Sequence, residues 1–373
     1  MQRYFFDRSY SIIPFTFTEM GKSSFKVLGV MSGTSLDGID LAECSFLFSE
    51  ENGWSYSFGV AKTIAYPDEW VTTLRAAVNY SKAQLLVLNI DYTNYLGSVI
   101  SGFIEEHQLR DLDAVCSHGH TILHRPDKGI TLQIGNLPEI AKVCGQNVVC
   151  DFRVQDVELG GQGAPLVPIG DKLLFGEYDY CLNLGGFANI SSEVNEQRIA
   201  YDVCPVNIVM NRYANLLGVP YDSEGRIARS GSIDQAVFER LNSLSYYIEK
   251  PPKSLGLEWV QEHIFPILEA GHLSPADTLR TFIEHVAIQL AARFDEGSVV
   301  LATGGGAYNS FLIERLGSVK ALQIVVPQDK LVEFKEALVF GFLGVLRLQN
   351  DVNCLASVTG ASRDHSSGIV YHL

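Results

Sequence analysis

Three apolar, strand-like runs in this chain end in glycine-rich turns, and this recurring pattern constrains the fold most. The first turn follows Val27 and Leu28 and reads GVMSGTSLDGID over residues 29–40. The second follows residues 181–184 and the third follows residues 299–301. A strand, a glycine turn and another strand in each half of the chain predict two similar α/β domains.

Hydrophobic periodicity predicts the elements around these turns. Alternating residues at 41–46 and 54–65 predict strands that open the chain as an antiparallel sheet. Helical spacing within residues 68–108 is carried by Leu85, Leu88, Tyr92, Leu96 and Ile100.

Later short strands alternate with helices, which predicts parallel pairing and helical crossovers, and a further helix is expected at 338–348. We expect a leader extension over residues 1–25, an N-terminal domain over 26–177 and a C-terminal domain over 178–373. The last helices are expected to be able to pack back on the first domain.

Composition and charge narrow the choice of ligand. With 373 residues, 47% hydrophobic and 19% charged, the chain is predicted to be globular and long enough for two cores. Its net charge of -15 argues against nucleic acid and against an anionic membrane surface. Seven scattered cysteines without a C-x-x-C pair are typical of a reduced, cytoplasmic chain. We therefore expect a small-molecule ligand.

The glycine turns are candidates for binding an anion such as phosphate. Small residues let the backbone approach a ligand, and their N–H and O–H groups can donate to it. The alternative for each turn is an ordinary tight turn, and none matches a P-loop or a G-x-G-x-x-G fingerprint. The loop at 160–163, GGQG, is expected either to approach a ligand closely or simply to connect two elements.

Histidines and aspartates supply the reactive side chains. His118, His120 and His124 form H-x-H-x3-H, but no cysteine or carboxylate stands at ligand spacing, so we favour hydrogen bonding to a polyhydroxylated substrate or a structural role over zinc. Asp37 follows the first turn, and Asp202 ends the strand-like segment RIAYD. Such aspartates are often caps, yet a phosphotransferase needs carboxylates for Mg²⁺ and for activating a nucleophile.

From about Val27 to Tyr371 the chain resembles the anhydro-N-acetylmuramic acid kinases of the actin-like and sugar-kinase ATPase superfamily. The motifs that carry this resemblance occur in family order: MSGTSLDGID, SHGHTILHRP, TLQIGN, DFRVQD with GGQGAPLVP, NLGGFANIS, PPKS, GGGAYN, KEA and VTGA. The resemblance implies two ribonuclease-H-like α/β domains around an interdomain cleft that binds ATP. It also implies Mg²⁺, a homodimer, and a reaction in which water opens the 1,6-anhydro ring while the sugar O6 takes the γ-phosphate.

The same resemblance assigns roles to individual residues. It implies nucleotide contacts at Ser32, Gly33, Thr34, Ser35, Asp37, Gly38, Gly185, Gly186, Asn189, Gly304, Gly305, Gly306 and Asn309. It implies sugar contacts at His120, Thr121, Arg153, Gly161, Gln162 and Gly163. Asp37 and Asp202 are implied as Mg²⁺ ligands, and Asp202 as the catalytic base. Glu336 is the reserve catalytic candidate, with a first-turn helix carboxylate as its alternative role.

The chain departs from the family pattern around the base. The family segment D-x-G-P-G-N is present as Asp202 to Asn207, with Cys204 and Val206 in place of the two glycines. If either position required a positive φ, a side chain there would be strained. Leu255 and Leu257 stand where threonine and arginine are common in the family.

Two alternatives to the anhydro-N-acetylmuramic acid reaction remain open from the sequence. One is an anhydrosugar kinase of the levoglucosan type, for which Arg153 is the discriminating residue because only the lactyl carboxylate calls for a cation. The other is a non-catalytic sugar or nucleotide sensor, which the altered loop at Cys204 and Val206 suggests. A filament-forming role leaves the sugar-side motifs unexplained.

Overall fold

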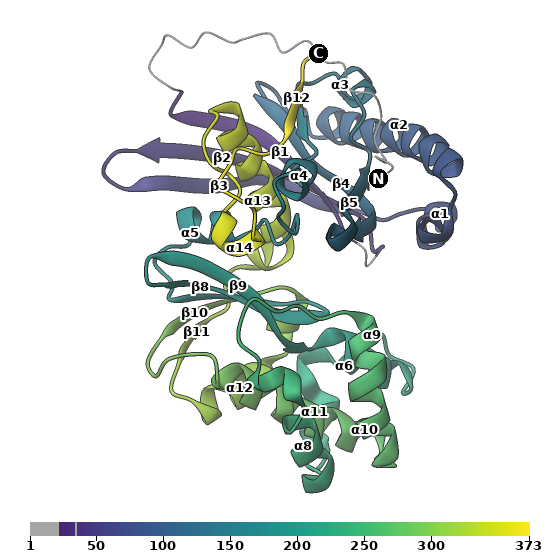
Figure 1. Ribbon diagram of the computed structural model, residues 1–373, viewed down its shortest axis with the longest axis vertical. Coiled ribbons are helices and arrows are strands. Elements are labelled where there is room, and N and C mark those ends of the chain that lie inside the picture. Colours follow the sequence, from purple (N-terminus) through teal and green to yellow (C-terminus); the bar gives the residue numbers. More distant parts are fainter. Residues whose placement is uncertain (1–21, 34–35) are drawn as a thin grey trace. The chain divides into compact units, whose positions relative to one another are not determined.

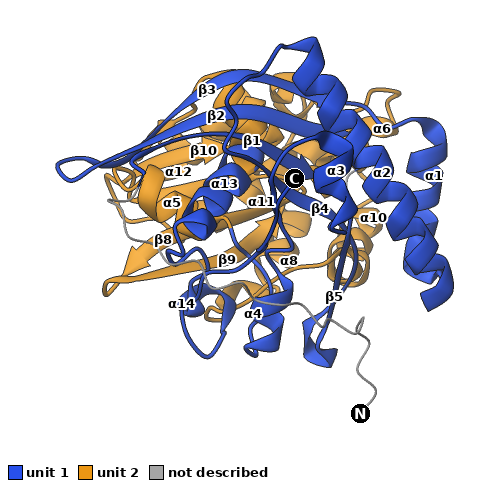
Figure 2. Cartoon of the chain, turned by 90° about the horizontal axis from the view of Figure 1, so that it is seen from above, with its two compact units in different colours: residues 1–166, 337–373 blue, residues 167–336 orange. Residues whose placement is uncertain are grey.

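The computed structural model describes residues 22–33 and 36–373. It divides into two compact units, the first holding residues up to 166 together with 337–373 and the second holding 167–336 (Figure 2). The chain passes back from the second unit to the first between residues 336 and 337, inside the helix α13 (Asp329–Leu348). In this division residues 167–177 belong to the second unit, whereas the sequence-based boundary stood at 177/178.

The first unit is built on a seven-stranded mixed sheet in the order β12-β6-β4-β1-β2-β3, with β5 paired to β4 (Figure 1). The pairs β1–β2 and β2–β3 are antiparallel, whereas β4 runs parallel to both β1 and β6. Its strands are β1 (Ser24–Ser32), β2 (Ile39–Ser49), β3 (Gly53–Ile64), β4 (Ala114–Arg125), β5 (Ile130–Ile134), β6 (Val148–Cys150) and β12 (Ile369–Tyr371).

Helices supply the other layers of the first unit. The predicted apolar spacing is confirmed in α2, where all five residues named above are buried in the core with Leu28 and Val115 of the sheet. The helix begins with a capping box between Ser81 and Gln84. From α13, Phe342 packs on Phe46 of β2. The helices of this unit besides the later part of α13 are α1 (Asp68–Ala76), α2 (Lys82–Glu106), α3 (Glu139–Cys144), α4 (Val154–Glu158) and α14 (Ala356–Thr359).

The second unit repeats the strand plan with five strands in the order β11-β10-β7-β8-β9. Here β7, β8 and β9 are antiparallel, while β7, β10 and β11 are parallel. An antiparallel three-stranded meander extended by parallel strands beside its first strand is the ribonuclease-H-like plan, so the predicted fold class is confirmed in both units. The strands are β7 (Tyr180–Leu184), β8 (Phe187–Val194), β9 (Gln197–Pro205), β10 (Val299–Thr303) and β11 (Gln323–Val325).

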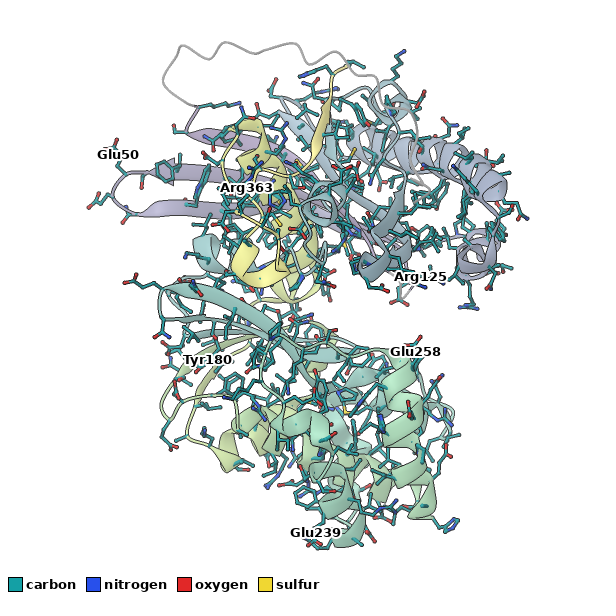
Figure 3. The ribbon with its side chains drawn as sticks, viewed as in Figure 1. Glu50, Arg125, Tyr180, Glu239, Glu258 and Arg363 are labelled. Atoms are coloured by element: carbon teal, nitrogen blue, oxygen red, sulfur yellow. The ribbon has the colours of Figure 1, made fainter. Side chains whose placement is uncertain are left out.

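The core of the second unit forms around α11, whose Phe282, Ile283 and Val286 are fully buried. Side chains fill the space between sheet and helices within each unit (Figure 3). The helices are α5 (Pro168–Leu174), α6 (Asn207–Asn215), α7 (Arg226–Ser230), α8 (Gln235–Asn242), α9 (Leu257–Trp259), α10 (Phe265–Ala270), α11 (Pro275–Ala291), α12 (Ser310–Val319) and the first part of α13. Short 3-10 and π turns are η1 (Ala77–Asn79), η2 (Pro126–Lys128), η3 (Ser223–Gly225), η4 (Ser245–Ile248), η5 (Val260–Ile264) and η6 (Gly305–Tyr308).

Two elements are longer than the sequence predicted. The helix expected at 338–348 is preceded by a turn of helix from Asp329, with a kink at Phe334 where the backbone leaves the helical region. Leu331 and Val332 bury one side of the part before the kink. The apolar residues 114–117 predict a short strand before the histidine motif, whereas β4 continues through this motif to Arg125 by pairing with β5.

The predicted state of the cysteines is confirmed, since all seven are buried free thiols. Over residues 22–33 and 36–373, the helices lack the length and apolar character needed to cross a bilayer.

Candidate active site

Parallel pairing of β1 and β4 in the first unit places Ser32, the last residue of β1, beside His120 within β4. The Ser32 hydroxyl shares hydrogen bonds with His120 Nδ1 at 2.7 Å and with the Tyr66 hydroxyl at 2.6 Å. Tyr66 in turn shares a 2.5 Å hydrogen bond with Tyr92. Ser32 and His120 are therefore parts of a buried and internally bonded network.

Burial decides the charge of this network. It lowers the pKa of His120 to about 4, so the imidazole is neutral near pH 7. Burial also raises the pKa of Tyr66 to about 12. A neutral network offers hydrogen bonds rather than charge, as expected for contact with sugar hydroxyls.

The first turn is only partly described. Thr34 and Ser35, both predicted phosphate contacts, lie outside the described residues. Gly33 accepts a turn hydrogen bond from Leu36 N–H at 3.3 Å, and Gly38 is buried against β3. Asp37 is exposed and can present its carboxylate to a ligand.

Arg153 links the histidine motif to the glycine loop. Its Nε donates to His118 Nε2 at 2.9 Å, and its Nη1 donates to the Gly163 carbonyl at 2.5 Å. His118 Nδ1 donates to the Gly119 carbonyl, which fixes the tautomer whose Nε2 accepts from the arginine. Burial and the Arg153 charge hold the pKa of His118 well below its ordinary value.

The remaining sugar-side candidates lie on two neighbouring segments. Thr121 stands opposite Gln133 across β4 and β5 and accepts from its Nε2 at 3.3 Å. Gly163 has φ 68°, a left-handed conformation that favours glycine. Gly161 is buried, while Gln162 between these two glycines is exposed. The structure thus brings Arg153 and Gly163 together directly, with His120 two residues after His118 on β4.

In the second unit, four polar side chains form a row across adjacent strands. Thr303 of β10 pairs with Asn183 of β7, Asn183 pairs with Asn189 of β8, and Asn189 pairs with Asp202 of β9. Directly opposed residues point to the same face of a sheet, with Cβ atoms about 5 Å apart. Asn189 and Asp202 are among the residues predicted from the sequence, whereas Asn183 and Thr303 are not, because strand pairing alone reveals them.

Asp202 sits beside a bulge in β9, where the register with β8 shifts. Its Oδ2 accepts from the Leu255 backbone N–H at 2.8 Å, and its carbonyl accepts from the Tyr246 hydroxyl at 2.7 Å. Burial raises the pKa of Asp202, and the Leu255 bond partly offsets this. A raised pKa makes the carboxylate a stronger base.

The PPKS segment supports this carboxylate, a role the sequence analysis did not assign. The backbone carbonyl of Lys253 accepts from the Asp202 N–H at 3.3 Å, and the Lys253 Nζ donates to the Tyr246 carbonyl at 2.8 Å. Because Leu255 acts through its backbone, a leucine there serves as well as the family's threonine for this contact. Leu257, at the start of α9, is 44% exposed.

The two glycine replacements near Asp202 carry no left-handed strain. Cys204 lies in β9 without a positive φ, and Val206 has φ −133° at the start of α6. The carbonyl of Gly186 accepts from Val206 N–H at 2.8 Å, and that of Gly185 accepts from Asn207 N–H at 3.2 Å. The second glycine turn therefore caps α6 through its own carbonyls.

The third glycine turn needs glycine for close approach at its first position. Gly304 has φ 79°, and a Cβ there would overlap the Asn183 side-chain oxygen. Gly306 likewise leaves no room for a Cβ, which would meet Leu184 at 2.8 Å, whereas Gly305 is exposed. Asn309 is buried and caps α12 by accepting from Leu312 N–H at 3.0 Å.

Glu336 is exposed inside α13 and follows the buried Lys335. Lys335 Nζ lies 2.7 Å from the Asp171 carboxylate. The backbone of α13 leaves the helical region at Phe334, so Glu336 lies two residues into the part of the helix that follows this kink. Its alternative role as a first-turn carboxylate therefore stays a prediction.

The histidine motif does not assemble a three-residue metal centre. In the described parts of the chain, a different group has the spacing of metal ligands. It consists of Asp156, Cys354 and His365, whose ligand atoms lie within 4.8 Å of one another. His124 instead shares a hydrogen bond with Thr131 at 3.2 Å.

A family model described as anhydro-N-acetylmuramic acid kinase matches residues 25–373. The anhydro-N-acetylmuramic acid kinase of Sulfurovum sp. (strain NBC37-1) is 33% identical over 367 residues, covering 93% of this chain and 99% of that protein. The enzyme of the same name from Mannheimia succiniciproducens is 32% identical and covers 92% and 98%.

A solved structure gives a weaker match. The activator of the 2-hydroxyisocaproyl-CoA dehydratase from Clostridium difficile with bound ADPNP has a TM-score of 0.42 and 13% identity, covering 87% of this chain and 97% of that one. At that similarity it adds nothing to the assignment.

Proposed function

The chain belongs to the anhydro-N-acetylmuramic acid kinase family, and from this premise we propose its reaction and the residues that perform it. As a kinase of this family it is a phosphotransferase that acts on a sugar hydroxyl. The substrate we propose is 1,6-anhydro-N-acetylmuramic acid, with ATP as phosphate donor, in cell-wall recycling.

The proposed reaction consumes one water and one ATP for each sugar. Asp202 takes a proton from water, whose oxygen bonds to C1 of the sugar. The C1–O6 bond breaks, and O6 attacks the γ-phosphorus as ADP leaves. The oxygen that leaves C1 is the phosphate acceptor, so one carboxylate suffices as base. The observation that carries this assignment is the half-buried Asp202, whose pKa burial raises and whose position Leu255 and Tyr246 fix.

The remaining candidates divide between the two ligands. For the nucleotide we propose Ser32, Gly33, Thr34, Ser35, Asp37, Gly38, Gly185, Gly186, Asn189, Gly304, Gly305 and Gly306, with Asn309 holding the start of α12. For the sugar we propose His120, Thr121, Gly161, Gln162 and Gly163, with the positive charge of Arg153 favouring the lactyl carboxylate. Glu336 remains the reserve catalytic group.

The donor chemistry fits Mg²⁺. Asp37 is exposed, and Asp202 is partly exposed with Oδ2 bonded to Leu255 N–H. Carboxylate oxygens are the ligands that Mg²⁺ prefers, and we propose these two aspartates as its protein ligands. When bound, Mg²⁺ would supply neutralisation of the phosphoryl charge.

The test is ADP release with Mg²⁺-ATP and each of three sugars: 1,6-anhydro-N-acetylmuramic acid, levoglucosan and N-acetylmuramic acid. We expect turnover with the first sugar and a 6-phosphorylated product that mass spectrometry identifies. Turnover with levoglucosan alone would keep the chemistry and refute the substrate. Binding of ATP and sugar by calorimetry without ADP release would refute the enzymatic proposal.

The proposed assembly is a homodimer, an expectation that rests on the family resemblance. Light scattering on the purified protein measures it directly, and a mass of one 41.1 kDa chain would contradict it.

A further inference from the structure

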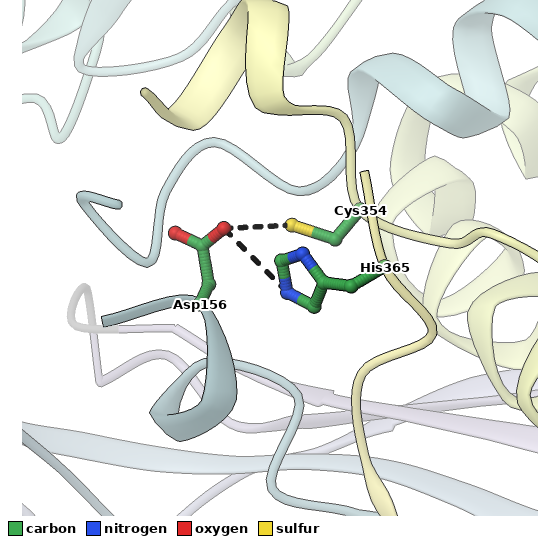
Figure 4. A group of neighbouring side chains, drawn as sticks. All are labelled: Asp156, Cys354 and His365. Carbon is green, nitrogen blue, oxygen red and sulfur yellow. Dashed lines mark hydrogen bonds and ion pairs between the residues drawn. The ribbon is translucent and has the colours of Figure 1, made fainter. Parts of the chain in front are cut away.

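Asp156 is a fully buried carboxylate that lies outside the reaction described above, yet it is surrounded by donors. Its Oδ2 accepts from the Gly163 N–H at 2.6 Å, and its Oδ1 accepts from the Thr359 hydroxyl at 2.7 Å. The Cys354 thiol donates to Oδ1 at 3.1 Å, and His365 Nε2 lies 3.6 Å from the same oxygen (Figure 4). A buried charge is tolerated when hydrogen bonds satisfy it in this way.

Asp156 and Arg153 hold Gly163 from both sides. Asp156 lies in α4 and Arg153 is its N-terminal cap residue. Asp156 binds the Gly163 N–H while Arg153 Nη1 donates to the Gly163 carbonyl. The Asp156 carbonyl also accepts from Gly161 N–H at 2.8 Å. Hydrogen bonds to charged groups are stronger than those between neutral groups. This arrangement therefore holds in one conformation a glycine-rich loop whose backbone has little conformational preference of its own.

The glycine at 161 is itself a consequence of this contact. A Cβ at that position would overlap the Asp156 carboxylate. The density of glycine in the loop therefore serves packing against α4, in addition to any approach to a ligand.

The segment from Cys354 to His365 closes the same loop from the far end of the sequence. Gln162 N–H donates to the Thr359 carbonyl at 2.8 Å, and Ser362 N–H donates to the Leu159 carbonyl at 3.0 Å. Thr359 thus contacts the loop through its backbone and contacts Asp156 through its hydroxyl. The C-terminal segment and the loop form one bonded unit around the carboxylate.

A metal ion is the competing occupant of this cluster. The three donor atoms of Asp156, Cys354 and His365 are close enough for one. However, structural zinc sites are almost always four-coordinate, and this group of described residues offers three such ligands. Both Asp156 oxygens already accept hydrogen bonds, so the geometry favours a hydrogen-bonded cluster.

We propose that Asp156 is a positioning residue for sugar binding, and that the C-terminal segment acts on the sugar-binding loop through Thr359 and this carboxylate. The inference rests on the proposed function, which places Arg153 and Gly161 to Gly163 on the sugar. Breaking the cluster should weaken sugar binding and leave ATP binding unchanged.

The experiment compares Thr359→Val, which removes the hydroxyl at nearly constant shape, with Thr359→Ser, which keeps it. The matched control is Thr278→Val, since Thr278 is equally buried and its hydroxyl bonds a carbonyl of its own chain segment at 3.0 Å. For each protein we would measure the KM for 1,6-anhydro-N-acetylmuramic acid, the KM for ATP, kcat and the melting temperature.

We expect Thr359→Val to raise the sugar KM roughly tenfold, the scale of one buried hydrogen bond, with the ATP KM unchanged. Thr359→Ser should restore the sugar KM, and Thr278→Val should lower only the melting temperature. Equal rises in both KM values, or a fall in melting temperature with no change in the sugar KM, would overturn the inference. So would stoichiometric zinc in the purified protein that is lost in Cys354→Ala. A wild-type protein without turnover would instead refute the proposed function.

Discussion

The two units share a strand order but treat their polar groups differently. In the first unit, Ser32, Tyr66 and His120 bond one another in a buried network. In the second, Asn183, Asn189 and Asp202 form a row that is only partly buried. The first arrangement is a buried, neutral network whose groups bond one another, whereas the second is a partly exposed row of a carboxylate and amides that can bind a ligand.

Burial acts on the titratable groups of both arrangements. Burial lowers the pKa of His118 and His120, which keeps the first network uncharged. Burial raises the pKa of Asp202, the proposed base, and the hydrogen bond from Leu255 N–H partly opposes this effect.

The largest effect is expected from Asp202→Asn, which replaces the carboxylate by a neutral amide of nearly the same shape. We expect kcat to fall about 10²- to 10⁴-fold, the usual contribution of a general base. The KM for the sugar should stay within about threefold, because the change affects a proton transfer, whereas the KM for ATP should rise because the variant also loses one proposed Mg²⁺ ligand. Steady-state kinetics measures this, and retained activity in Asp202→Asn with loss in Glu336→Gln would transfer the role of base to Glu336.

The next largest effect concerns the buried network of Ser32, Tyr66 and His120 and the pH dependence of its contribution to stability. The folded pKa of His120 is about 4, below the ordinary 6.5, so the unfolded chain binds its proton first as pH falls. This contribution to stability is present above pH 6.5 and is lost between about 6.5 and 4. The shift corresponds to roughly 3 kcal/mol.

His120→Gln removes this titration while keeping one hydrogen-bonding side chain. We expect the free energy of unfolding of the variant to fall less steeply between pH 6.5 and 4 than that of the wild type. Urea unfolding at a series of pH values measures both slopes. Identical slopes would mean that His120 is not held neutral by burial.

Gly304→Ala tests the close approach of the third glycine turn to Asn183, one member of the polar row in the second unit. The side chain would take a left-handed conformation and overlap Asn183, so we expect a loss of about 2 kcal/mol in stability and a higher ATP KM. Gly305→Ala is the matched control for stability, since the nearest atom to its Cβ, Asn207 Nδ2, lies 4.0 Å away. Equal losses of stability in the two variants, measured by calorimetry, would contradict the role of close packing.

The smallest effect is expected at Asn309. Its side chain caps α12, so Asn309→Ala should cost about 1 kcal/mol while Asn309→Ser should retain most of the stability. The ATP KM should stay within about twofold in both variants. A large rise in both would show that Asn309 contacts the nucleotide directly.

Much of this molecule follows from the sequence because local pattern suffices for it. The spacing of Leu85 through Ile100 determines the buried face of α2, and the strand–turn–strand repeats indicate two units of one type. The ordered motifs point to the family, since several short matches together are more specific than any one. Asp202 could be named because it is the one aspartate of its motif.

The rest depends on contacts between distant residues, which local pattern does not encode. Strand pairing alone placed Asn183 beside Asn189 and Asp202, and the φ values alone showed that Cys204 and Val206 are tolerated. The bonds between Asp156 and Thr359 join segments far apart in the chain. The family, the fold class and the candidate base could be predicted from the amino-acid sequence, because they depend on residue identity and spacing. Which groups are buried and which partners satisfy them became known from the structure, because burial and hydrogen bonding are properties of the packed chain.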